Sequence, residues 1–220
     1  MNQIESPHGN ADVLFEDDYI VALSKPHGLH VVDDRNRRQS TMKSLLTVRY
    51  GRIYVVHRLD AGTGGVIVFA KTPEVHSALC GQFERGEAEK EYHAIVAGDF
   101  SGAVSVFLPI SPKPGHGKYK VNFKSGKAAV TTFYVLERYE TASLVKVIPL
   151  TGRTHQIRVH LRALKHPLYK DWLYSAPDSD RRLTLFAKKL SVVHPVSGKR
   201  LIIETELSEF MIGCLRQLRV

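Results

Sequence analysis

Short runs of apolar residues, or of alternating apolar and polar residues, recur along the whole chain. A period of two is typical of half-buried strands, and short β-branched or aromatic runs favour fully buried ones. Such runs cover residues 19–23, 53–56, 66–70, 92–97, 104–108, 130–136, 144–148, 184–193 and 201–204. The strands that they predict outnumber the helices. The pattern therefore predicts an α+β fold, with a mainly antiparallel mixed sheet and flanking helices.

Two segments carry the end signals of helices. Residues 41–50 stop at Gly51, and glycine commonly ends helices. Residues 73–85 begin with a proline, which suits the first turn of a helix, and stop at Gly86. We predict one helix in each of these two segments.

The strongest helical pattern covers residues 154–165, between Thr154 as a candidate N-cap and Pro167 beyond the end. One stripe of this helix is apolar and should enter the core. A second stripe, about 100° round the axis, is basic and consists of Arg158, Arg162 and Lys165. The basic stripe is either a solvated edge of an amphipathic helix or a surface that binds a polyanion.

Residues 111–126 form the longest segment without a clear period, and they are rich in Pro, Gly and Lys. We predict a mobile basic loop there, which could contact phosphates. No repeat or linker divides the chain. We therefore expect a single domain at residues 13–220, preceded by a flexible N-terminus at residues 1–12.

The chain has 220 residues, of which 43% are hydrophobic, so it can bury a substantial core. Lys and Arg total 31 against 22 for Asp and Glu, and the formal net charge of +9 indicates either a polyanionic partner or simple solubility. The two cysteines lie far apart without metal-ligand spacing, and no apolar run is long enough to span a bilayer. These features predict a soluble, cytoplasmic protein without a disulfide framework or a zinc site.

The most unusual local sequence is HRLDAGTGG at residues 57–65, between two predicted strands. It places an acid and a base on a glycine-rich segment, and glycines allow a sharp turn and the close approach of another molecule. Asp60 is therefore either a candidate catalytic side chain or a turn-forming residue of a hairpin. The segment lacks the pattern of a phosphate-binding P-loop.

Two further segments carry candidate chemistry. The sequence TGRTHQIRVHL at residues 151–161 places Arg153 just before the predicted helix, where unsatisfied N–H groups favour anions. Arg153 could equally be a surface residue of a capped helix. The sequence EKEYHA at residues 89–94 opens a predicted strand with Tyr92, which is either core packing or a site residue.

Together and in this order, the three segments resemble the RluA family of pseudouridine synthases. That family carries HRLD-x-x-T-S-G, K-x-Y and T-G-R-x-H-Q-[IL]-R-x-H-L, where this chain has HRLDAGTGG, KEY and TGRTHQIRVHL. Weaker matches extend the resemblance from about residue 13 to residue 207 and include LSKPHGL, HPLYKD and HPVSG. The chain departs from the family pattern at Gly64, Lys170 and Phe186, where the family usually has Ser, Gly and His.

The resemblance implies the pseudouridine synthase catalytic fold with a central RNA-binding cleft. The implied enzyme isomerises uridine to pseudouridine in structured rRNA or tRNA, without a cofactor or metal. Asp60 would be the nucleophile and would attack C1′ of the ribose or C6 of the base. Arg153 would pair with this carboxylate and keep it charged in a desolvated pocket. Tyr92 would stack on the uracil and assist proton removal from C5.

The resemblance also implies which residues hold the RNA. Arg58, with His57, would either fill the space that a flipped nucleotide leaves in its stack or hold the displaced nucleotides. Leu185 would line the pocket for the base, and the basic stripe of Arg158, Arg162 and Lys165 would contact phosphates. Many relatives carry an N-terminal S4 domain, whereas we expect a stand-alone catalytic domain here, which would select the substrate by itself. We expect RNA as the partner, no membrane and no obligate protein partner, and a monomer.

Two other functions fit parts of the pattern. A non-catalytic RNA-binding or ribosome-assembly factor could share the fold and the charge, but it would have little reason to hold Asp60, Tyr92 and Arg153 in these three motifs. A base-excising glycosylase would also flip nucleotides. It would release free uracil, whereas a synthase leaves the mass of the RNA unchanged.

Overall fold

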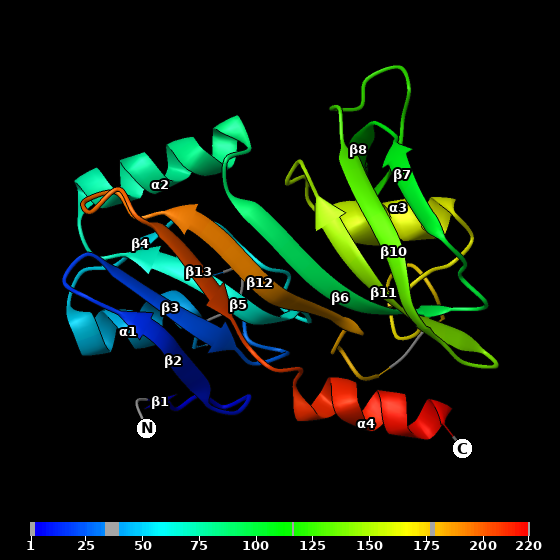
Figure 1. Ribbon diagram of the computed structural model, residues 1–220, viewed down its shortest axis with the longest axis horizontal. Helices are drawn as coiled ribbons and strands as arrows, with labels where there is room; N and C mark the ends of the chain where they lie inside the picture. Colours follow the sequence, from blue (N-terminus) through cyan, green and yellow to red (C-terminus); the bar gives the residue numbers. More distant parts are fainter. Residues whose placement is uncertain (1–2, 34–39, 116, 177–178, 220) are drawn as a thin grey trace. The chain divides into compact units, whose positions relative to one another are not determined.

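The computed structural model describes residues 3–33, 40–115, 117–176 and 179–219 (Figure 1). Its contacts divide the chain into two compact units. Unit 1 consists of Met1–Glu89 and Ala187–Ser208, and unit 2 consists of Lys90–Phe186 and Glu209–Val220. The chain therefore passes from unit 1 to unit 2 within one strand, β6, and returns within another, β12.

Unit 1 is built on a sheet with the strand order β1-β2-β3-β5-β12, in which β4 also pairs with β5 and β13 with β12. Its elements are β1 (Gln3–Ile4), β2 (Ala11–Glu16), β3 (Ile20–Lys25), α1 (Met42–Tyr50), β4 (Tyr54–Val55), β5 (Gly64–Ala70), α2 (Pro73–Arg85), most of β12 (Leu185–Val193) and β13 (Arg200–Glu204). Every residue of the central strand β5 is buried. Helix α2 packs Val75 and Leu79 against core residues of β3 and β5, such as Ile20 and Val68. The core of unit 1 thus holds both ends of the HRLDAGTGG segment, which connects β4 to β5.

Unit 2 contains an antiparallel sheet with the order β6-β11-β10-β7 and a separate two-stranded hairpin of β8 and β9. Its elements are β6 (Glu89–Ala97), β7 (Ala103–Phe107), β8 (Ile110–Lys113), β9 (Lys118–Val121), β10 (Val130–Arg138), β11 (Ala142–Pro149), α3 (Gln156–Ala163) and α4 (Glu209–Leu218). The apolar stripe of α3 packs Ile157 and Leu161 against Phe133 and Val145 of the sheet. The sheet thereby positions α3 and the TGRTHQ segment that leads into it.

The predicted strands and the two predicted helices at 41–50 and 73–85 are confirmed, with ends shifted by a few residues. These two helices could be predicted because their capping residues lie next to the helical segments in the sequence. Thr41 and Ser44 form a reciprocal capping box, and Thr72 caps α2 before its first-turn proline. Short β1, β2 and the C-terminal helix α4 were not predicted. Within the segment expected to be a flexible N-terminus, Gln3–Ile4 pairs with the start of β2, whereas residues 1 and 2 lie outside the described part.

The predicted mobile basic loop at 111–126 instead contains the hairpin of β8 and β9, and His116 within it lies outside the described residues. Pro112 of β8 obscures the strand pattern in the sequence, although an edge strand tolerates a proline. Tyr119 and Val121 of β9 pack on a small cluster around Val159 and Tyr174. These contacts join residues that lie far apart in the sequence, and they stabilise the segment as a hairpin.

The third predicted helix differs at its start. Helix α3 begins at Gln156, and its N-cap is His155 with φ 55°, in the left-handed region, without a side-chain cap. The prediction of Thr154 as N-cap is therefore wrong. The side chain of Gln156 instead holds the segment before the helix, because its Oε1 accepts from the backbone N–H of Arg153 and from the hydroxyl of Thr151.

No helix in the described ranges combines the length and the apolar character needed to cross a membrane.

Candidate active site and RNA-binding residues

Asp60 lies on the loop between β4 and β5 in unit 1 and is half-buried, while its neighbour Arg58 is exposed. The loop turns tightly after Asp60, because the backbone N–H of Thr63 donates to the carbonyl of Asp60 at 3.0 Å. Leu59, between the two polar residues, is buried and anchors the segment. The loop thus presents one carboxylate and one guanidinium from a fixed backbone.

Lys25, at the end of β3, places a positive charge that interacts with Asp60 within unit 1. Lys25 is fully buried, and its Nζ donates to the carbonyls of Pro26 at 2.9 Å, Leu29 at 2.8 Å and Ala61 at 3.1 Å. Burial lowers the pKa of Lys25 to about 7, and the negative charge of Asp60 acts in the opposite direction. Lys25 therefore ties the loop down and places a titratable cation next to the carboxylate.

The titration of Lys25 should be visible in stability. The folded protein releases this proton near pH 7, whereas an unfolded lysine keeps it until its ordinary value of 10.5. Between these values the unfolded state binds more protons, so the free energy of unfolding rises with pH, by at most about 1.4 kcal/mol per pH unit. We expect urea unfolding from pH 7 to pH 9 to show a steeper rise in the wild type and in the control Lys43→Met than in Lys25→Met. Parallel curves of unfolding free energy against pH for all three proteins would refute this role of Lys25.

His57 at the start of the loop is engaged with the protein. Its Nε2 accepts from the backbone N–H of Val68 at 3.2 Å, and its ring stacks on Phe83 of α2 with centroids 4.5 Å apart and planes 19° apart. The neutral ring therefore carries its proton on Nδ1. In this structure His57 holds the loop against β5 and α2, while the adjacent Arg58 is the exposed cation.

In unit 2, Tyr92 lies on β6 opposite Val147 of β11 and is half-buried against the main core cluster. Leu185, only 4% exposed, belongs to the same cluster. The two predicted base-pocket residues are therefore brought into one apolar region of unit 2. Burial also lowers the pKa of Lys90, two residues before Tyr92.

Arg153 lies between β11 and α3 and is exposed, and its Nε donates to the carbonyl of Ala128 at 3.0 Å. Its backbone is held by Gln156, which is buried. The amide nitrogen of Gln156 in turn donates to the carbonyl of Val130 and to the hydroxyl of Thr131, at 2.9 Å each. The glutamine in the TGRTHQ sequence thus fixes the arginine relative to β10.

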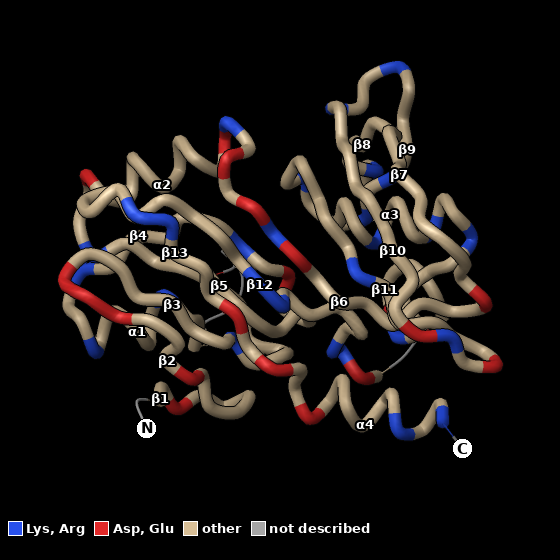
Figure 2. Tube along the Cα trace, viewed as in Figure 1, with Lys and Arg blue, Asp and Glu red and all other residues tan. Residues whose placement is uncertain are grey.

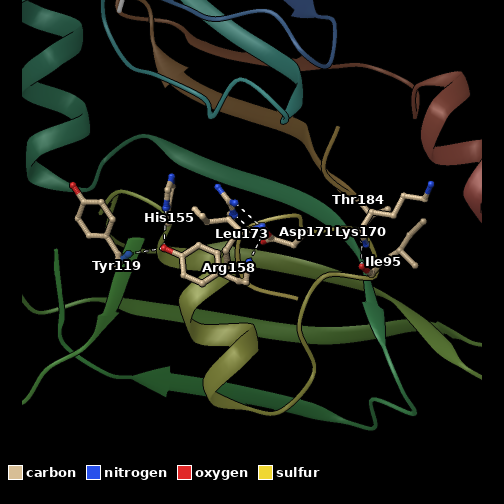
Figure 3. Close-up of polar contacts among 9 residues, drawn as sticks. Ile95, Tyr119, His155, Arg158, Lys170, Asp171, Leu173 and Thr184 are labelled. Carbon is tan, nitrogen blue, oxygen red and sulfur yellow. Dashed lines mark hydrogen bonds and ion pairs between the residues drawn. The ribbon is translucent and has the colours of Figure 1, made fainter. Parts of the chain in front are cut away.

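Arg158 does not belong to a basic surface stripe, which corrects the prediction from helical periodicity. It is 2% exposed, and its Nε and Nη2 donate to the two carboxylate oxygens of Asp171 at 2.8 Å each (Figure 3). Its guanidinium also lies 4.9 Å from the centre of the Tyr174 ring. A buried, bidentate pair of this kind is structural, so Arg158 is not available to phosphates. Arg162 and Lys165, by contrast, are exposed.

A network of polar contacts continues from this buried pair. The backbone N–H groups of Leu173 and Tyr174 donate to Asp171 at 3.0 Å. The hydroxyl of Tyr174 then accepts from the backbone N–H of Tyr119 at 2.6 Å and lies 2.9 Å from Nδ1 of His155 (Figure 3). These bonds join the β8–β9 hairpin, the start of α3 and the Asp171 turn within unit 2.

Sequence reasoning missed Lys25, His27, Asp171 and Tyr174. Lys25 and His27 lie in the KPHG sequence, and Asp171 lies in HPLYKD, both of which were matched to the family without a role. Lys25 could have been recognised from the sequence, because it ends an otherwise apolar strand. A lysine in such a place is buried only when its N–H groups have hydrogen-bond acceptors.

The comparisons with known proteins agree with these motifs. A family model described as RNA pseudouridylate synthase matches residues 19–163. The chain is 39% identical over 192 residues to the dual-specificity RNA pseudouridine synthase RluA of Vibrio cholerae, covering 84% of this chain and 78% of that protein. It is 34% identical over 223 residues to the ribosomal large subunit pseudouridine synthase D of Nitrosomonas europaea, covering 94% of this chain and 65% of that protein.

A comparison with solved structures also finds a pseudouridylate synthase. Human RNA pseudouridylate synthase domain containing 4 superposes with a TM-score of 0.78 at 26% identity, covering 94% of this chain and 93% of that one. The fold and the motifs define an RNA-modifying isomerase. The chain belongs to the RluA family of RNA pseudouridylate synthases, and it isomerises uridine to pseudouridine in RNA.

Proposed function

We propose that Asp60 is the nucleophile of this isomerisation. The carboxylate attacks C1′ of the ribose or C6 of the base, the N1–C1′ bond breaks, and the uracil turns. A bond from C5 to C1′ then forms, and the bond between Asp60 and the substrate breaks, which restores the free carboxylate. C5 loses its proton and N1 gains one, so the product is an isomer of the substrate. The observation that carries this proposal is the position of Asp60 on a loop fixed by Lys25, within the family's HRLD sequence.

The remaining roles follow from the resemblance. Arg153 is the partner that keeps Asp60 ionised in the substrate complex, where desolvation would favour the neutral acid. Tyr92 stacks on the uracil and assists the loss of the C5 proton, and Leu185 lines the base pocket. Arg58 fills the space that the flipped nucleotide leaves. His57 supports Arg58 through its contacts with Val68 and Phe83.

We propose structured rRNA or tRNA as the substrate, since the relatives include both a dual-specificity enzyme and a large-subunit rRNA enzyme. Mapping pseudouridines in rRNA and tRNA from a strain lacking the gene, before and after treatment with purified protein, would identify the site. A pseudouridine restored at a defined position supports the proposal. No restored position in either RNA would refute it. The cytoplasmic location and the monomeric state stay predictions.

We expect Arg162 and Lys165, together with lysines around the β8–β9 hairpin, to bind RNA phosphates (Figure 2). Replacing Arg162 or Lys165 with Ala should weaken RNA binding several-fold and lower the slope of log affinity against log salt by about 1. Fluorescence anisotropy at several salt concentrations measures both quantities. Lys43→Ala on α1 serves as the control for loss of a positive charge. An unchanged slope for both variants would exclude these residues from the interface.

A further inference from the structure

His27 is a buried side chain that contacts the loop of Asp60 and has no role in the mechanism above. It is 7% exposed and lies in the segment that links β3 to the chain before α1. Its Nδ1 lies 2.7 Å from the carbonyl oxygen of Gly62, and its Nε2 lies 3.0 Å from the hydroxyl of Ser208. Because a carbonyl oxygen only accepts, Nδ1 must carry the proton, and in the neutral ring Nε2 accepts from Ser208.

Residues 25–28 donate hydrogen bonds to the two backbone carbonyls that follow Asp60 in the chain, those of Ala61 and Gly62. The carbonyl of Ala61 accepts from Nζ of Lys25 at 3.1 Å and from the backbone N–H of Gly28 at 2.8 Å. The carbonyl of Gly62 accepts from His27. Without His27, the second of these carbonyls would lose this donor inside the protein, and the loop would lose a fixed point two residues from the nucleophile.

The same imidazole also explains the glycine at position 64, where the chain departs from its family's serine. A Cβ added at Gly64 would lie 2.7 Å from Cδ2 and Nε2 of His27 and 3.2 Å from the carbonyl oxygen of Lys25. The ring cannot move away cheaply, because it is buried and bonded at both nitrogens. Histidine at 27 and glycine at 64 therefore depend on each other.

We propose that His27 is a positioning residue, which fixes the Asp60 loop through the Gly62 carbonyl and occupies the space that Gly64 leaves open. This inference rests on the proposed role of Asp60. The histidine acts on the reaction through the backbone of the loop and does not contact the substrate.

The test measures kcat, KM and thermal stability, with turnover assayed at a temperature where every variant is folded. His27→Ala should lower kcat about ten- to a hundredfold with KM within about twofold, because a misplaced group costs rate more than binding. His27→Asn keeps an N–H near the position of Nδ1 and should recover most of kcat. His194→Ala removes another buried, hydrogen-bonded histidine of unit 1 and should lower the melting temperature without changing kcat. An unchanged kcat in His27→Ala, or no recovery in His27→Asn, would overturn the proposal.

The dependence between positions 27 and 64 is tested by stability alone. Gly64→Ser should lower the melting temperature, and His27→Ala/Gly64→Ser should melt above Gly64→Ser because the ring is gone. A double variant that melts at a lower temperature than both single variants would overturn this part.

If the wild type or Asp60→Asn showed that the proposed function is wrong, hydrogen exchange would still test the effect of His27 on the loop. The amide of Thr63, which donates to the Asp60 carbonyl, should exchange faster in His27→Ala than in the wild type.

Discussion

Asp60→Asn is expected to lower the single-turnover rate of pseudouridine formation by at least about a thousandfold, because loss of a nucleophile removes the covalent route. The amide has nearly the same size and should not disturb the loop. RNA affinity should stay within about twofold, because it comes mainly from phosphate contacts elsewhere on the protein. Asp18→Asn, an exposed aspartate of the same unit, is the matched control and should keep the full rate.

The Asp60 prediction is specific because it expects the rate of pseudouridine formation to fall while the RNA affinity stays the same. A purely structural Asp60 would lower the melting temperature and weaken RNA binding together with the rate. Rapid-quench product analysis and filter binding on the same preparations measure the two quantities. A variant that binds RNA normally and forms pseudouridine at more than about a tenth of the wild-type rate would exclude Asp60 as the nucleophile.

Asp171→Ala is expected to lower the free energy of unfolding by about 3 to 5 kcal/mol, since it leaves the guanidinium of Arg158 buried without its partner. The side chains of this pair are only 2% and 1% exposed. The substitution also removes the acceptor for the backbone N–H groups of Leu173 and Tyr174. Urea unfolding monitored by tryptophan fluorescence measures the loss.

Asp180→Ala is the matched control for the buried pair. Asp180 pairs with Arg182, whose side chain is 50% exposed, so its loss should cost at most about 1 kcal/mol. Arg158→Met combined with Asp171→Leu should be less destabilised than Asp171→Ala, because no buried charge is left alone. A loss of less than about 1 kcal/mol in Asp171→Ala would show that the pair is not buried in solution.

Features set by neighbours in the chain were predictable from the sequence. The helix α2 follows from a threonine cap, a first-turn proline and a terminal glycine, all within one segment. The strands β5 and β10 follow from runs of β-branched and aromatic residues. The candidate nucleophile was found because its loop combines an acid, a base and glycines with a family sequence.

Features set by partners far away in the chain were not predictable. The periodicity of α3 placed Arg158 beside Arg162, but its burial depends on Asp171, which lies in a turn after the helix. The hairpin of β8 and β9 packs on Val159 and Tyr174, and the hydroxyl of Tyr174 accepts from the backbone N–H of Tyr119. Likewise, the sequence does not show why position 64 is glycine, because the ring of His27 that lies beside it comes from a distant part of the chain.

The most direct test of Asp60-dependent isomerisation uses RNA labelled with tritium at C5 of uridine. The wild type should release tritium to water while the RNA keeps its mass and no free uracil appears. Asp60→Asn should release none above background. Release of free uracil by the wild type, or equal tritium release by Asp60→Asn, would contradict the account.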